Sequence, residues 1–185
     1  NTVWLAIVSS NFQTIEVIPM DISDTVTPLV KDPIALTSGG KIGNISIGTA
    51  ADTVVAVWED KVDATTHLFS SRLTVDGATN STGVLTAAGP NSQTAPTVTP
   101  CGDDGFFTLW TDSRFGVDGF PSTIAGIYTT TTGPYYTEDL LIAASRRQLK
   151  LLSAAPLSNG CAVAWHGILS NNVPSPTVLT YIDPK

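Results

Sequence analysis

The stretch "DDGFFTLWTDSRFG" (residues 103–116) contains the pattern that decides the fold. It reads as a turn, then a run of β-favouring residues that ends at Trp110, and then a short burst of charge. The sequence has only four tryptophans, Trp4, Trp58, Trp110 and Trp165, and they are 54, 52 and 55 positions apart. A period of about fifty residues is typical of propellers and solenoids.

The flanks of each tryptophan predict an antiparallel meander. β-favouring runs lead into the tryptophans as "TVW", "VVAVW", "FFTLW" and "CAVAW", and a turn precedes the last three. Another short strand is expected before those turns, at 44–48, 96–99 and 151–155. A polar loop after each tryptophan leads to further strands, at 14–22, 66–75, 123–131 and 177–182, and then at 33–38, 83–88 and 139–144. Meanders of this kind, stacked radially, form propeller blades.

These residues resemble the divergent β-propeller repeats of secreted and cell-surface proteins. A blade of such repeats reads apolar-apolar-x-apolar-Trp-x-Asp-x-Arg, then a loop, then Ile-x-Gly-x. "FFTLWTDSR" (106–114) with "IAGIY" (124–128) fits well, and "VVAVWEDK" (54–61) fits in part. The resemblance implies an all-β fold, a propeller-like array of four-stranded antiparallel blades, with a β-solenoid or a β-sandwich as the alternative. It does not fix a function, because propellers host many activities.

We expect one propeller-like domain or segment with repeats at roughly 1–40, 41–92, 93–147 and 148–185. The first repeat begins at its second strand and the last ends after its third, so the chain carries about three and a half blades, whereas propellers close with four to eight. Other polypeptide, either flanking sequence or neighbouring subunits, is therefore expected to complete the ring, because native proteins cover exposed strand edges.

Composition excludes several classes of partner. The net charge is −7, with 9 basic and 16 acidic residues, which argues against nucleic acid and against an anionic membrane surface. No apolar run approaches the ~18 residues of a membrane-spanning helix, so membrane insertion is not expected. The chain starts at an asparagine, from which we expect it to be processed or excised from something larger.

The loops after the tryptophans form the candidate binding face. By resemblance they lie together where propellers bind ligands, and they contribute Glu59, Asp60, Asp112, Arg114, Phe115, Phe120 and His166. Paired acids could serve glycoside chemistry. Asp60 and Asp112, however, both stand two positions after a tryptophan, where an aspartate commonly hydrogen-bonds the turn. A structural role is therefore predicted for both, with Arg114 as the partner of Asp112.

The predicted inner strands suggest no catalytic centre. They offer Asn44, Ser46, Thr97, Thr99 and Ser153, with no histidine, acid or lysine to act as a general acid or base. The only histidines, His67 and His166, lie about two repeats apart, so a multi-histidine metal site is not expected. We expect no catalytic residue, no metal and no cofactor.

Two further features concern the cellular compartment. Cys101 and Cys161 occupy places that adjacent blades bring close, which slightly favours a disulfide over two buried thiols. Asn44 and Asn80 begin N-glycosylation sequences, and Asn80, in a predicted loop, is the better candidate. Together with the richness in Ser and Thr, these features favour an extracellular or cell-surface protein.

The leading functional prediction is a non-catalytic extracellular propeller segment that acts as a scaffold, an interaction module or an adhesion module. The alternative is a glycan-binding or glycoside-processing propeller that uses the acidic and aromatic loop face. An enzyme is the less favoured outcome.

Overall fold

Fifteen β-strands make up the regular structure of the described residues. The structure, a computed structural model, describes residues 2–24, 26–37, 40–50, 52–62, 64–74, 76, 79–85, 92–103, 105–114, 122–131, 139–145, 148–168 and 176–183. The strands form four antiparallel sheets, in which most consecutive strands are neighbours. Val, Ile, Thr and aromatic residues dominate them, as expected for residues that fit a pleated surface.

Each sheet is a meander of consecutive strands, which we call a blade. Blade 1 contains β1 (Thr2–Val8), β2 (Thr14–Asp21), β3 (Leu29–Val30) and β4 (Ile34–Thr37). Blade 2 contains β5 (Lys41–Ala50), β6 (Thr53–Val62), β7 (Thr65–Thr74) and β8 (Thr79–Val84). Blade 3 contains β9 (Gln93–Pro100), β10 (Gly105–Asp112), β11 (Ser122–Thr130) and β12 (Leu140–Ser145). Blade 4 contains β13 (Gln148–Leu157), β14 (Gly160–Ile168) and β15 (Val178–Ile182).

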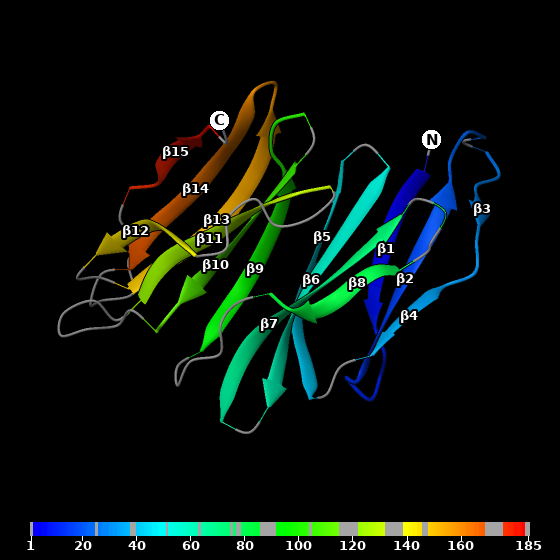
Figure 1. Cartoon of the computed structure of the whole chain (residues 1–185), viewed down its shortest axis with the longest axis horizontal. Helices are drawn as coiled ribbons and strands as arrows, with labels where there is room; N and C mark the ends of the chain where they lie inside the picture. Colours follow the sequence, from blue (N-terminus) through cyan, green and yellow to red (C-terminus); the bar gives the residue numbers. More distant parts are fainter. Residues whose placement is uncertain are drawn as a thin grey trace.

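The blades stand in chain order, from blue at one side of Figure 1 to orange and red at the other. The strands that start blades 2, 3 and 4 are neighbours in space, since β5 contacts β9 and β9 contacts β13. The predicted fold class is therefore confirmed: the protein is all-β, and its antiparallel sheets form a propeller-like array.

The core lies between the blades rather than within one sheet. Three buried clusters fill the gaps between successive blades: Trp4, Ile15 and Trp58 belong to the first, Val57 and Trp110 to the second, and Leu109, Leu149 and Val163 to the third. Because side chains alternate between the two faces of a strand, Val57 and Trp58 of β6 pack against different neighbouring blades.

The tryptophans occupy strands in all four blades. Trp4 lies on β1, Trp58 on β6, Trp110 on β10 and Trp165 on β14. Trp58 and Trp110 are fully buried, Trp4 is buried at 9% exposure, and Trp165 is partly buried. The two central blades therefore bury their tryptophans most completely, because each has a neighbouring sheet on both faces.

The disulfide that the sequence favours is present between blades 3 and 4. Cys101, which directly follows β9, is bonded to Cys161 on β14, with the Cα atoms 4.9 Å apart. Both residues are fully buried, and they contribute to the cluster that packs the two blades together.

Three details differ from the sequence predictions. The outer strand of blade 1 is divided, because β3 and β4 pair with opposite ends of β2. The strand predicted at 83–88 is shifted: β8 begins at Thr79, and the sequence has an Asp-Gly turn signal at 76–77, ahead of this strand. The inner strands are longer than predicted, so β5 includes Lys41 and β13 includes Lys150.

No helix in the described part of the chain is long and apolar enough to cross a membrane.

Candidate functional site

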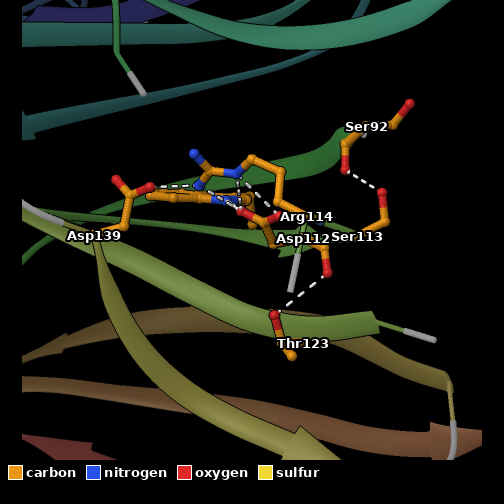
Figure 2. Close-up of polar contacts among 7 residues, drawn as sticks. Ser92, Asp112, Ser113, Arg114, Thr123 and Asp139 are labelled. Atoms are coloured by element: carbon orange, nitrogen blue, oxygen red, sulfur yellow. Dashed lines mark hydrogen bonds and ion pairs between the residues drawn. The ribbon is translucent and has the colours of Figure 1, made fainter. Parts of the chain in front are cut away.

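The charged side chains at the end of β10 form hydrogen bonds and ion pairs with one another and with neighbouring residues. Asp112 is fully buried, and its carboxylate accepts hydrogen bonds from the Trp110 indole N–H at 2.7 Å and from the Arg114 backbone N–H at 2.7 Å. The Arg114 guanidinium donates to the same carboxylate, with the shortest contact at 2.6 Å, and it also pairs with Asp139 at the start of blade 3's outer strand. Figure 2 shows the two carboxylates on either side of the guanidinium.

This arrangement fixes both the charge and the position of Arg114. Burial by itself would lower the pKa of Arg114, but the hydrogen bonds and charges of Asp112 and Asp139 outweigh it and raise the pKa above its ordinary value. The adjoining Ser113 hydroxyl donates to the Ser92 carbonyl at 2.8 Å, and the Thr123 hydroxyl donates to the Asp112 carbonyl at 3.3 Å. The predicted pairing of Asp112 with Arg114 is confirmed as a structural contact.

The matching end of blade 2 is organised around Glu59. Its carboxylate accepts hydrogen bonds from the Asn44 backbone N–H at 3.1 Å, from the Asn44 side-chain amide at 2.8 Å and from the Ala95 backbone N–H at 2.7 Å. Asn44 belongs to β5 and Ala95 to β9, so Glu59 connects the inner strands of blades 2 and 3. Ser46 adds a second connection, because its hydroxyl oxygen accepts a hydrogen bond from the Val98 N–H at 3.0 Å.

A β-bulge creates the space that Glu59 occupies. Between Ile42 and Ile45 the β5–β6 register shifts, so that two residues of β5, Gly43 and Asn44, stand against one of β6. A Cβ at position 43 would collide with the Glu59 carboxylate, which would have to shift to make room. The bulge thus turns two donors of β5 toward the carboxylate.

Asp60 does not repeat the role of Asp112. It is fully buried like Asp112, on the opposite face of β6 from Glu59. The indole N–H of Trp58 finds no hydrogen-bond partner in the described part of the chain, whereas the Trp110 indole donates to Asp112. The two aspartates at equivalent sequence positions therefore have different contacts.

A shallow hollow of about 200 Å³ opens beside Glu59, and we call it the blade 2 hollow. Its lining consists of Lys41, Ile42, Gly43, Glu59, Lys61 and Thr66. Lys41 is the direct cross-strand neighbour of Lys61, and Lys61 is the direct neighbour of Thr66, so the three side chains form a row across β5, β6 and β7. Both lysines are exposed, and neither forms an ion pair with a residue that the structure describes.

An exposed aromatic ring stands next to this row. The Lys41 ammonium lies over the ring of Phe12, 4.9 Å from its centroid, and the Phe12 carbonyl accepts a hydrogen bond from the Ile42 N–H at 2.7 Å. Phe12 is 47% exposed and adopts a left-handed backbone conformation, with φ of 57°. The loop between β1 and β2 therefore reaches the start of β5, and both lie at the lower edge of the molecule in Figure 1.

The remaining predicted residues are dispersed. The alternation along β14 places Cys161 and Val163 against blade 3 and His166 on the opposite face of blade 4. Phe115 and Phe120 lie outside the described residues, as does the side chain of Asn80, whose backbone is part of β8. The Asn44 amide is engaged with Glu59. The predicted face is thus not one cluster among the described residues, and ligand binding by its members stays a prediction.

Sequence reasoning missed Phe12, Lys41, Lys61 and Thr66. Phe12 stands in the loop after Trp4, as Phe115 stands in the loop after Trp110, so the position within the repeat was a usable signal. Lys61 directly follows Asp60, which was selected for its charge. Lys41 lies before the inner strand predicted at 44–48. Cross-strand register, which sequence does not give, is what brings these residues together.

Comparisons with known proteins find similar solved structures but no relative by sequence. No family model matches the chain, and no curated protein matches it. Among solved structures, it is similar to one described as "GH43 Endo-Arabinanase from Bacillus licheniformis", with 15% sequence identity and a TM-score of 0.48, over 97% of this chain and 68% of that chain.

The prediction of a non-catalytic scaffold is corrected. The premise of the scaffold prediction fails in the chain itself, because β5 carries Lys41, β13 carries Lys150, and Glu59 stands between β5 and β9. The inner strands are therefore not devoid of ionisable groups.

Proposed function

We propose that this chain is a carbohydrate-binding, propeller-like module that holds a sugar at the blade 2 hollow. The observation that carries the proposal is the cross-strand row of Lys41, Lys61 and Thr66 along a hollow of about 200 Å³, with the exposed ring of Phe12 beside it. Binding sites for small molecules are typically concave and combine apolar surface with a few polar groups that fix orientation.

The chemistry of these groups suits a sugar. A pyranose ring presents C–H groups on its faces and hydroxyls around its edge, so it needs an apolar surface and several hydrogen-bonding groups. The exposed ring of Phe12 supplies apolar surface, while the Thr66 hydroxyl and the two ammonium groups supply donors. A shallow, open site of this kind accommodates part of a longer chain.

Binding is favoured over hydrolysis. Glycoside hydrolysis generally uses two carboxyl groups that flank the scissile bond. Glu59 is the carboxylate that lines the blade 2 hollow, and three donors already hold it in place. We therefore propose that Glu59 holds β5 and β9 in place beside the hollow and takes no part in hydrolysis.

A glycan array followed by calorimetric titration tests the proposal. We expect the wild-type chain to bind a defined set of oligosaccharides, and Phe12→Ala and Thr66→Val to weaken that binding. Tyr181→Ala is the matched control, because Tyr181 is an exposed aromatic residue on blade 4. The absence of binding to every glycan on the array, or equal binding by Phe12→Ala and the wild type, would contradict the proposal.

We also propose that other polypeptide completes the array. The outer face of blade 1 exposes Val3, Leu5 and Ile7, and Leu179 and Tyr181 are exposed on blade 4. These are the kinds of residue that pack between blades elsewhere in the molecule. Light scattering on the isolated 185 residues tests this, and a soluble monomer that unfolds cooperatively would contradict it.

Two further properties, the pattern of one tryptophan per blade and the cellular location, belong to the same proposal. We infer that one tryptophan marks each blade and that the module functions outside the cell, where disulfides such as Cys101–Cys161 persist. Trapping of free thiols in protein taken directly from its native source tests the second point. Two alkylated cysteines there would contradict it.

A further inference from the structure

We infer that the blade 2 hollow is selective for acidic sugars and that Lys41 and Lys61 together bind the anionic group, a uronate carboxylate. This inference rests on the proposed function and names the substrate class of the same site. It starts from an arrangement that folding alone does not favour: two lysines directly opposite each other on neighbouring strands. Like charges in directly opposite positions destabilise a sheet.

Among the described residues, no acid relieves this repulsion. Glu59 is the nearest acidic side chain along the same face of β6, but the bonds that it accepts come from Asn44 and Ala95. Neither Lys41 nor Lys61 is ion-paired with a described residue. The Lys41 ammonium lies over the Phe12 ring, a contact that leaves its hydrogen-bonding positions available.

Two basic residues side by side are also unusual in a chain with a net negative charge. The protein has 9 basic and 16 acidic residues, yet two of the basic ones line the same hollow. An oxyanion placed between two ammonium groups receives charge-assisted hydrogen bonds from both and cancels their repulsion. The Thr66 hydroxyl at the end of the row provides a further donor.

The proposed site recognises both the anionic group and the sugar ring that carries it. A compact ammonium binds an anion as a point charge, so the lysines alone would accept any small oxyanion. The exposed Phe12 ring adds the apolar surface that distinguishes a uronate residue from a free inorganic anion. The predicted ligand class is therefore an oligosaccharide with uronate residues.

A matched pair of oligosaccharides provides the test. Oligogalacturonate and the same oligosaccharide with its carboxyl groups reduced differ only at C6, where a carboxylate is replaced by a neutral hydroxymethyl group, and each is titrated by calorimetry into the full chain. We expect the acidic form to bind on the order of tenfold more tightly or better, the size of one charge-assisted hydrogen bond. We expect this preference to decline as salt is added, because screening weakens exposed charges.

Substitutions of the two lysines test whether they cause the preference for the acidic oligosaccharide. Lys41→Gln and Lys61→Gln should each reduce the affinity for oligogalacturonate on the order of tenfold without a comparable change for the reduced form. Lys150→Gln, which removes an exposed lysine from blade 4, should leave both affinities unchanged. The melting temperature of Lys61→Gln should equal or exceed that of the wild type, which separates loss of a ligand contact from loss of structure.

Each outcome has a distinct meaning. Equal affinity for the two oligosaccharides would overturn the acidic-sugar inference and leave carbohydrate binding intact. An acidic preference that survives in Lys41→Gln and Lys61→Gln would also overturn the inference. Titration with sodium sulfate covers the remaining case: if sulfate binds in a lysine-dependent manner but no oligosaccharide does, both the inference and the proposed function are wrong.

Discussion

The tryptophan-bearing strands of blades 2 and 3, β6 and β10, end in the same sequence pattern, but the charged residues of that pattern make different contacts. Each has a tryptophan, an aspartate two residues later and a basic residue nearby, with Asp60 and Lys61 in one and Asp112 and Arg114 in the other. In blade 3 the cation is held by Asp112 and by Asp139. In blade 2 the cations, Lys61 and Lys41, oppose each other at an open hollow.

The difference indicates which charges serve the fold and which are available to a ligand. The Arg114 side chain is only 11% exposed, and its bidentate geometry suits a guanidinium that is fixed between carboxylates. Lys41 and Lys61 are exposed and are not neutralised by a described acid. Charged residues that are close in sequence therefore have a structural role where the folded chain pairs them with opposite charges. Where they are left unpaired, they form a candidate binding site.

The largest effect is expected from Asp112→Ala. This substitution leaves the Trp110 indole and the Arg114 backbone N–H without their acceptor, and it removes one of the two carboxylates from Arg114. Breaking a buried ion pair costs about 3–5 kcal/mol of folding free energy. Urea unfolding measures it, with Asp24→Asn as the exposed control. A loss below about 1 kcal/mol, the range of surface ion pairs, would contradict the closed network.

A smaller effect is expected from Glu59→Ala. The three donors of Asn44 and Ala95 would lose their acceptor, and burying an unsatisfied donor costs about 1–3 kcal/mol. Gly43→Ala provides an independent test, because the added Cβ displaces the same carboxylate without removing it. Both variants should unfold at lower urea concentration than the wild type. If Glu59→Ala were as stable as the wild type, Glu59 would not connect blades 2 and 3.

The smallest effect on stability, and one of opposite sign, is expected from Lys61→Gln. Removal of one of two opposed charges relieves a repulsion of about 0.2–1 kcal/mol. The gain should fall as salt is added, since screening already weakens the repulsion in the wild type. Thermal unfolding at low and high ionic strength measures this, with Lys150→Gln as the control. A clear destabilisation would mean that Lys61 has a structural role.

The sequence predicted the fold more completely than the site. Repeats around Trp58, Trp110 and Trp165, with turn signals before them, identify antiparallel blades because local propensity and turn chemistry agree there. The pairing of Asp112 with Arg114 was also predictable, since both residues lie within one turn of the chain. The opposition of Lys41 and Lys61 was not, because it depends on strand register and on a bulge at Gly43.

The most direct test of the account is residue-resolved NMR during titration of the full chain with the tightest-binding oligosaccharide. The account predicts that chemical shift changes centre on Phe12, Lys41, Lys61 and Thr66, and that the signals of Trp110, Asp112 and Arg114 stay in place. Changes that centre on Asp112 and Arg114 and leave Lys41 and Lys61 unaffected would contradict it.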